Sequence, residues 1–300
     1  MKQAPEWNRE VLLNSPLFAP LHPLLAELGN SIFPSLHDCN ALLDAHYPPI
    51  NVQSGMPLRF VAQQQGKLPF DAQYEPRCYL NGEVQMRANN RHDLFNALVW
   101  LTFPKTKAIL NARHYHALQD TSTGSAQGAR EVSKGGVLRY LSTNGCSQRG
   151  AVRDANTLFD ESGVIVVCSD TNLAALLRGF KWKELFWQRR EQVRPQSGKQ
   201  DMGFYLFGHG LYEKALQPYV GMTGQGLLLA VEKGYFNWPM ERQLTHLDNL
   251  LADYLAAPEY CRSTRDLSPV PLLGVPGWAA ENDDETYYDN TAYFRSGRRV

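Results

Sequence analysis

The sequence lacks the features that mark membrane proteins and disulfide-stabilised scaffolds. No window approaches the roughly 20 consecutive apolar residues that a helix needs to span a bilayer. A secretory signal has a basic region followed by an uninterrupted apolar run. The first residues, MKQAPEWNREVLLNSPLF, contain no such run. The five cysteines are an odd number without a C-x-x-C pair, so neither a disulfide framework nor a structural zinc site is indicated. We therefore expect a cytoplasmic protein that is not integral to a membrane.

The chain also lacks an excess of charge of either sign. Its 30 basic residues balance 30 acidic ones, so no global field draws it to nucleic acid or to an anionic membrane, and any such binding must be local. Three familiar motifs are missing as well: the G-x-G-x-x-G fingerprint, the Walker A loop and the G-x-S-x-G elbow. Their absence argues against nucleotide binding by those routes.

What the chain does contain is the composition of a folded globular protein, with 43% hydrophobic and 11% aromatic residues. Helical signals dominate it. Ser35, with Asp38 three residues later, is a variant of the capping box and predicts a helix over 35–46. Apolar residues at helical spacing after Pro239 predict a longer amphipathic helix.

Strand signals are fewer and predict a small sheet. Residues 58–63, LRFVAQ, are expected to form a strand, and Asn-Gly at 81–82, between YEPRCYL and VQMR, is typical of a hairpin. A second hairpin is expected over 157–170, TLFDESGVIVVCSD. Residues 119–151 are rich in Gly, Ser, Thr, Gln and Asn and are expected to form a long loop or insertion. The order of elements indicates an α+β fold, mainly helical with small hairpins or a small sheet, in a single domain over 1–300.

The segment 90–118, NRHDLFNALVWLTFPKTKAILNARHYHAL, predicts two helices separated by Pro104. If these helices fold back as an antiparallel hairpin, His92 and His114 lie roughly 18 and 15 Å from the turn and can meet. His116 is about 200° round the helix from His114, so it should point elsewhere.

Further polar side chains accompany the two histidines. His92 shares a helix face with Asn96, His114 shares one with Asn111, and Asp93 stands next to His92. Imidazole and carboxylate groups suit zinc, iron or manganese, and a carboxylate that fixes the tautomer of a histidine suits acid/base catalysis. The structural alternative is that these groups cap helices and bond to backbone, since their spacing matches no metal signature such as H-E-x-x-H.

Two other short motifs contain candidate metal-binding or proton-transfer residues. In FGHGLYEKAL, His209 lies near a helix start with Glu213 four residues later, so both can join one metal or proton-transfer site, and the glycines permit a close backbone approach. In LFDESG, the paired carboxylates Asp160 and Glu161 suit metal binding or acid/base work. The structural alternatives are a capping histidine at a strand-to-helix turn and an acidic turn before Ser-Gly.

The stretch 178–194, RGFKWKELFWQRREQVR, interleaves basic residues with aromatic ones. A nucleic-acid surface has this pattern, with phosphates on Lys and Arg and bases on the aromatic rings. An amphipathic helix that packs its aromatics into the core and exposes its charges has the same pattern. The glutamates within the stretch and the zero net charge favour the core interpretation.

Several long words of this chain occur together, in the same order, in a known family. They are HDLFNALVWLTFPKTKAILNARH, LFDESG, FKWKELFW, FGHGLYEKAL with PYVGMTG, and LLGVPGW before YYDNTAYFR. With them the chain resembles the bacterial DUF3025 family from about residue 7 to the C-terminus, while residues 119–148 lie between motifs. That family is functionally uncharacterised, so the resemblance implies one domain but no substrate and no catalytic residues.

Three functional hypotheses follow, of which we favour the first. It is an enzyme that performs metal-assisted hydrolysis or acid/base chemistry, and it requires its residues to converge on one pocket. The second is a binding protein that uses 178–194, with nucleic acid as the open alternative and no membrane partner. The third is a module whose polar residues are all structural. The residues of the enzyme hypothesis are His92, Asp93, His114, His209 and Glu213 as catalytic groups, Asn96, Asn111, Asp160 and Glu161 as pocket lining, and His92, His114 and His209 as ligands of a divalent metal.

Overall fold

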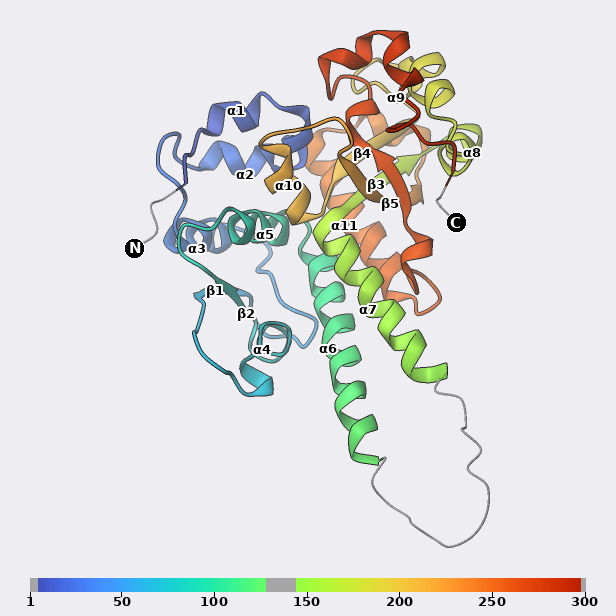
Figure 1. Cartoon of the computed structure of the whole chain (residues 1–300). Coiled ribbons are helices and arrows are strands. Elements are labelled where there is room, and N and C mark those ends of the chain that lie inside the picture. The colour runs from blue at the N-terminus through green and yellow to red at the C-terminus, as the bar shows by residue number, and fades with distance from the viewer. Residues whose placement is uncertain (1–4, 128–143, 298–300) are drawn as a thin grey trace, which may run out of the picture.

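A four-stranded mixed sheet forms the centre of the protein in the computed structural model, which describes residues 5–127 and 144–297 (Figure 1). The strand order is β4-β3-β5-β6, with β3 antiparallel to β4 and parallel to β5, and β5 antiparallel to β6. Every residue of β3 and β4 is buried, as expected of strands covered on both faces. The strands are β3 (Gly163–Cys168), β4 (Met202–Leu206), β5 (Thr223–Ala230) and β6 (Ser268–Pro271).

A second, two-stranded sheet lies beside the N-terminal helices. Strand β1 (Arg59–Ala62) confirms the strand predicted over 58–63, and it pairs in parallel with β2 (Glu83–Met86). The hairpin predicted at Asn-Gly is wrong, because YEPRCYL forms helix α4 (Tyr74–Asn81) and only VQMR is a strand. Gly82 ends α4 in the left-handed conformation, at φ 70° and ψ 15°. A glycine at positive φ serves a tight hairpin turn and a helix C-cap equally well, so the dipeptide alone could not decide between them.

Helices surround both sheets and make up most of the described chain. The helix predicted from Ser35 is α3, with its capping box in place, and Pro239 precedes the long amphipathic helix α11 as expected. The helices not yet given are α1 (Arg9–Leu13), α2 (His22–Glu27), α3 (Leu36–Asp44), α5 (Arg91–Thr102), α6 (Pro104–Gln127), α7 (Asn144–Ser162), α8 (Thr171–Arg178), α9 (Arg190–Val193), α10 (His209–Ala215) and α11 (Met240–Ala256), with a π-helical turn at Glu184–Gln188.

The predicted break at Pro104 is confirmed, but the two helices on either side of it do not form the expected antiparallel hairpin. Helix α6 packs mainly against α4, α7 and α11, and in Figure 1 it runs steeply away from α5 alongside α7. Contacts with α11 and α7, more than contacts with α5, therefore fix the direction of α6.

Two other expectations about local structure need correction. The hairpin predicted over 157–170 is wrong, because its first half is the end of α7 and only its second half is a strand, β3. The segment 119–151, expected as a loop or insertion, is helical at both ends, where it belongs to α6 and α7. Its middle, 128–143, lies outside the described residues.

The elements together give a mainly helical α+β fold in a single domain, as the sequence predicted. Among the described residues, no helix combines the length and the apolar character that crossing a membrane requires.

Candidate metal centre

Three helix ends meet at the end of the central sheet where β3 begins and β4 ends. Because β3 and β4 are antiparallel, the end of α7, which leads into β3, lies beside the start of α10, which follows β4. The backbone N–H groups of Phe207 and Gly208 both donate to the carbonyl oxygen of Gly163, at 3.0 and 2.9 Å, and hold the two junctions together. The N-terminal turn of α5 joins them, since α5 packs against α10. Side chains from three distant parts of the chain are therefore brought to one place.

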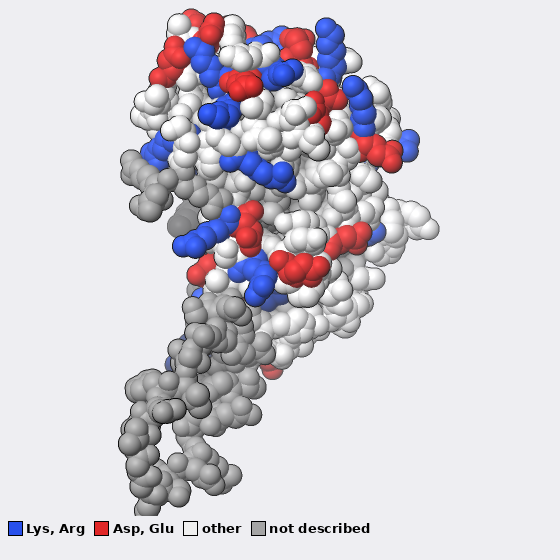
Figure 2. Space-filling view, turned by 90° about the vertical axis from the view of Figure 1, so that its right-hand side faces the viewer, with Lys and Arg blue, Asp and Glu red and all other residues white. Residues whose placement is uncertain are grey.

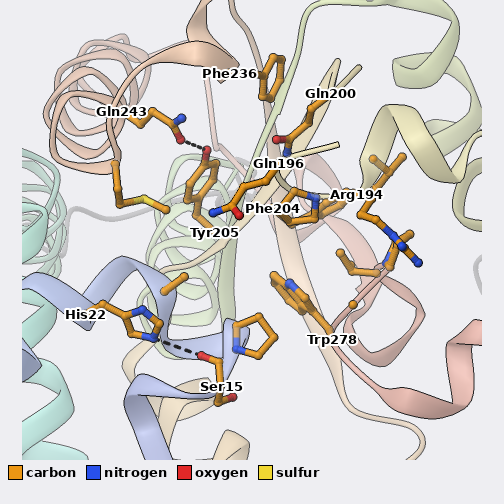
Figure 3. Close-up of a pocket in the computed structure, with 18 of the residues that line it drawn as sticks. Ser15, His22, Arg194, Gln196, Gln200, Phe204, Tyr205, Phe236, Gln243 and Trp278 are labelled. Atoms are coloured by element: carbon orange, nitrogen blue, oxygen red, sulfur yellow. Dashed lines mark hydrogen bonds between the residues drawn. The ribbon is translucent and has the colours of Figure 1, made fainter. Parts of the chain in front are cut away.

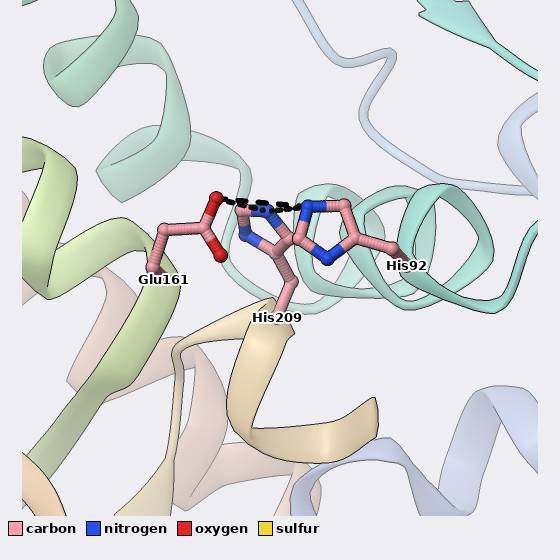
Figure 4. A group of neighbouring side chains, drawn as sticks. All are labelled: His92, Glu161 and His209. Carbon is pink, nitrogen blue, oxygen red and sulfur yellow. Dashed lines mark hydrogen bonds and ion pairs between the residues drawn. The ribbon is translucent and has the colours of Figure 1, made fainter. Parts of the chain in front are cut away.

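The side chains that meet there are His92, Glu161 and His209 (Figure 4). The Nε2 atoms of His92 and His209 are 3.0 Å apart. Oε1 of Glu161 lies 3.4 Å from Nε2 of His209 and 3.6 Å from Nε2 of His92. A zinc ion with nitrogen and oxygen ligands at about 2.0–2.1 Å separates them by about 3.3–3.4 Å in tetrahedral geometry. The three donor atoms are thus spaced like one face of such a tetrahedron.

Each of the two histidines has a carboxylate at its other ring nitrogen. Nδ1 of His92 is 3.4 Å from Oε2 of Glu213, and Nδ1 of His209 is 3.7 Å from Oδ2 of Asp160. Nδ1 of His209 is buried and makes no hydrogen bond in the described structure. Carboxylates in this position orient metal-binding histidines and fix the tautomer that leaves Nε2 free to bind.

The two glycines of F-G-H-G allow this approach. A Cβ atom on Gly210 would lie 2.7 Å from Oε2 of Glu161 and 2.9 Å from its carbonyl oxygen, and one on Gly208 would overlap the backbone at the α7–β3 junction. The sequence indicated that these glycines permit a close backbone approach. What approaches them is the end of α7, which carries Glu161.

The electrostatics of the centre keep its two carboxylates ionised. Contacts with His209 and His92 hold the pKa of Glu161 well below its usual value, and the contact with Glu161 raises the pKa of His92 against the effect of its burial. Burial acts to raise the pKa of Asp160, but the positive charges of Lys107 and His209 outweigh it and hold that pKa below its usual value. Both carboxylates are therefore ionised at neutral pH.

Lys107, which sequence reasoning missed, supports Asp160 from inside the protein. Its side chain is 4% exposed, and Nζ donates to Oδ1 of Asp160 at 2.5 Å and to Oδ1 of Asn96 at 2.9 Å. A signal for it was present, because Lys107 lies four residues before Asn111 and seven before His114, on one helix face. A lysine aligned with two other polar residues and followed by the apolar run 108–110 indicates a buried partner.

A cavity of about 550 Å³ opens beside the three central residues. Its wall includes polar groups that the sequence did not single out, among them Tyr74, Arg87 and Arg153. Of the predicted site residues, those that line it are His92, Asp93, Asn96, His114, Asp160, Glu161 and His209. Most of the convergence that the enzyme hypothesis required is therefore present in the fold.

The remaining predicted residues lie elsewhere or are already engaged. Asp93 lines the cavity but is held by Arg87, whose guanidinium donates to its two oxygens at 2.7 and 2.9 Å. Asn111 donates to Oε2 of Glu75 at 2.6 Å in an adjoining recess. His114 is buried in the cavity wall, and in the described structure no hydrogen bond or ion pair joins it to His92. The nitrogen that meets His92 comes from α10, because α6 does not fold back along α5.

The basic-aromatic stretch 178–194 contributes aromatic rings to the core. Trp182 is 4% exposed and donates from Nε1 to the carbonyl of Arg295 at 2.7 Å, while Trp187 packs against Tyr288. On the face shown in Figure 2, Lys and Arg alternate with Asp and Glu and form no broad basic patch. These contacts favour the core interpretation of the stretch.

Comparison with known proteins identifies one family. The family described as "Protein of unknown function (DUF3025)" matches residues 58–298, a range that contains every residue of the candidate centre. Neither the curated proteins nor the solved structures include one that matches the chain.

Proposed function

The chain belongs to the DUF3025 family, for which no activity is known, so its function must be inferred from the site, and we propose a metal-dependent hydrolase. The metal ligands are His92, Glu161 and His209. The observation that carries this proposal is the spacing of their donor atoms, 3.0, 3.4 and 3.6 Å, beside the 3.3–3.4 Å or so of a zinc tetrahedron.

The donor set also fits a catalytic rather than a structural metal. Structural zinc sites are closed by four protein ligands, whereas catalytic ones use three, often two histidines and a carboxylate, and keep one position open. Here the three donors border a cavity, so a substrate that entered it could reach an ion held by them. Glu213 and Asp160 lie where carboxylates orient metal-binding histidines. Nδ1 of His209 is buried without a hydrogen bond, and Asp160 is the carboxylate nearest to accept one from it.

A divalent ion held by these residues supplies a Lewis acid and activates water at neutral pH. The other residues bind and position. His114, in the cavity wall, is placed to transfer a proton to or from a bound substrate. The polar wall, with Arg87 and Arg153, suits a small polar substrate, since the cavity volume is about 550 Å³.

One observation favours a second function, acid/base catalysis without a metal. Oε1 of Glu161 contacts both imidazoles, so the carboxylate can hold one ring while that ring passes a proton. Metal analysis separates the two functions.

Titration of metal-stripped protein with zinc, measured by isothermal calorimetry, tests the proposal. We expect one equivalent to bind, and we expect His92→Ala and His209→Ala each to abolish stoichiometric binding. His116→Ala, which removes an exposed histidine of α6, is the matched control and should bind zinc like the parent. Absence of binding in the parent, or equal binding in all three variants, overturns the proposal; zinc-independent turnover that His92→Ala abolishes supports the second function.

A further inference from the structure

A second cavity, of about 860 Å³, shares no lining residue with the cavity of the candidate centre. It lies between the N-terminal helices, strand β4, the chain after α9 and the start of α11 (Figure 3). Neither the family match nor the proposed function gives it a role. We call it the aromatic cavity, for the five rings in its wall: Phe204, Tyr205, Phe236, Trp238 and Trp278.

The wall of the aromatic cavity is already fixed in position. The hydroxyl of Tyr205 donates to Oε1 of Gln243 at 2.5 Å, and Nε2 of Gln243 donates to the carbonyl of Trp238 at 2.9 Å. Trp278 meets Phe204 edge to face, with ring centroids 6.5 Å apart, and both rings are largely buried. A preformed, ring-lined space of this size is typical of a site for a flat apolar group.

Arg194 adds positive charge at this cavity. Its Nη2 lies 3.3 Å from Oδ1 of Asp283, and the guanidinium of Arg190 pairs with the same carboxylate oxygen. Two guanidinium groups thus share one carboxylate. Nε of Arg194 is buried and has no hydrogen-bond partner in the described structure. The Arg194 side chain as a whole is 42% exposed and lines the cavity, so a negatively charged ligand there can pair with its guanidinium group.

Gln196 brings an uncommitted amide into the same space. Its side chain is exposed to solvent and lines the cavity together with Tyr205 and Phe204 (Figure 3), and no hydrogen bond joins it to another group in the described chain. Its backbone has φ 59°, a conformation that non-glycine residues seldom adopt and that persists where surrounding structure enforces it. The backbone is therefore strained at this one residue, which lines the cavity.

We propose that the aromatic cavity binds a small planar aromatic anion. Its ring lies against Tyr205, Phe204 and Trp278, its negative charge pairs with Arg194, and Gln196 hydrogen-bonds a polar substituent. The inference is independent of the proposed hydrolase, since neither cavity contributes residues to the other.

Fluorescence titration with anilinonaphthalene sulfonate, an aromatic anion with a planar naphthalene ring system, tests this proposal. Phenylnaphthylamine, which has the same rings without the sulfonate, is the neutral comparison. We expect the full-length folded protein to bind one equivalent of the anion, more tightly than the neutral compound. Arg194→Gln should weaken binding of the anion about tenfold and leave the neutral compound unaffected. Arg178→Gln, at an exposed position on α8, is the charge-matched control and should change neither affinity.

A second variant works in the opposite direction. Asp283→Asn removes the carboxylate that competes for Arg194, so it should strengthen binding of the anion. Circular dichroism confirms that each variant keeps the native fold. The proposal is overturned if the anion and the neutral compound bind equally well, or if both Arg194→Gln and Asp283→Asn bind the anion like the parent. His92→Ala should bind it normally, even if it loses zinc.

Discussion

The Nε2 atoms of His92 and His209 lie 3.0 Å apart, although the residues are 117 positions apart in the sequence. Two imidazole nitrogens at that separation need something between them, either a proton that one donates to the other or a cation that both bind. Oε1 of Glu161, within 3.6 Å of both nitrogens, supplies a third atom that can bind a cation, and it carries a negative charge. The arrangement is thus stabilised by positive charge, which a shared proton or a bound divalent ion would supply.

Gly210→Ala should weaken zinc binding by displacing Glu161. The added Cβ would lie 2.7 Å from Oε2 of Glu161 and 2.9 Å from its carbonyl oxygen, so the end of α7 must shift. Calorimetric titration measures the affinity. Gly234→Ala is the matched control, because no atom lies within 4 Å of its added Cβ. Equal affinities for the two variants would show that the approach of α7 to α10 does not set the ligand geometry.

Glu213→Gln should lower zinc affinity by about 10- to 100-fold while stoichiometry stays at one equivalent, because Glu213 orients His92 without binding the ion. Glu241→Gln, exposed at the start of α11, is the control. Complete loss of stoichiometric binding would instead make Glu213 a ligand. Unchanged affinity would remove it from the centre.

His114→Gln should keep one equivalent of zinc but lower turnover by a factor of about 10²–10⁴, the usual contribution of a positioned proton-transfer group. The measurement is hydrolysis of a panel of nitrophenyl esters and phosphate esters by the zinc-loaded protein, with zinc content determined in parallel. If zinc is lost with the activity, His114 belongs among the ligands, as its sequence position first suggested.

Lys107→Met should destabilise the fold by about 3–5 kcal/mol, since it leaves Asp160 as a buried carboxylate without its cation. Denaturant unfolding of the metal-free protein measures the loss. Combining Lys107→Met with Asp160→Leu should recover most of it, because no unpaired charge then remains. A loss below about 1 kcal/mol for the single variant would mean that water screens the pair.

Asp248 gives a pH dependence that is independent of the candidate centre. It accepts hydrogen bonds from the backbone N–H groups of Lys105 and Thr106, at 3.0 and 2.8 Å, and burial raises its pKa. The folded protein therefore keeps this proton to a higher pH than the unfolded chain, whose aspartates have pKa values of about 3.9. The free energy of unfolding falls as pH rises from that value through the raised pKa, and the loss is complete above it.

Asp248→Asn carries no such proton, so its stability relative to the parent should increase across that pH interval. Denaturant unfolding at several pH values measures the difference. Asp253→Asn, at an exposed position of the same helix, is the control. A difference between Asp248→Asn and the parent that stays constant with pH contradicts the assignment.

Local signals predicted most helices, because caps and apolar periodicity are properties of neighbouring residues. The capping box at Ser35 and the break at Pro104 are examples. Local signals failed where two structures need the same residue. Gly82 suits a hairpin and a helix end alike, and Glu161 lies in a word that suits a turn but forms the last turn of α7.

The candidate centre could be predicted only in part, for a reason of topology. The sequence nominated His92 from its expected meeting with His114 and His209 from its place near a helix start, and it required them to converge without giving a structural reason. Their meeting depends on the antiparallel pairing of β3 with β4, which sets the α7 and α10 ends side by side. No spacing within one segment contains that information, so the hairpin of α5 and α6 was assumed instead and gave His114 as the partner.

The same topology makes an ion at this centre a cross-link. His92, Glu161 and His209 belong to three different helices, so one ion bound to all three would close two large loops of the chain, as a pair of disulfides does. Closing such loops removes conformational freedom from the unfolded chain. Removal of the ion by a chelator would then lower the rigidity of the protein as well as abolish its activity. The junction of α5, α7 and α10 would be the first part of the fold to loosen.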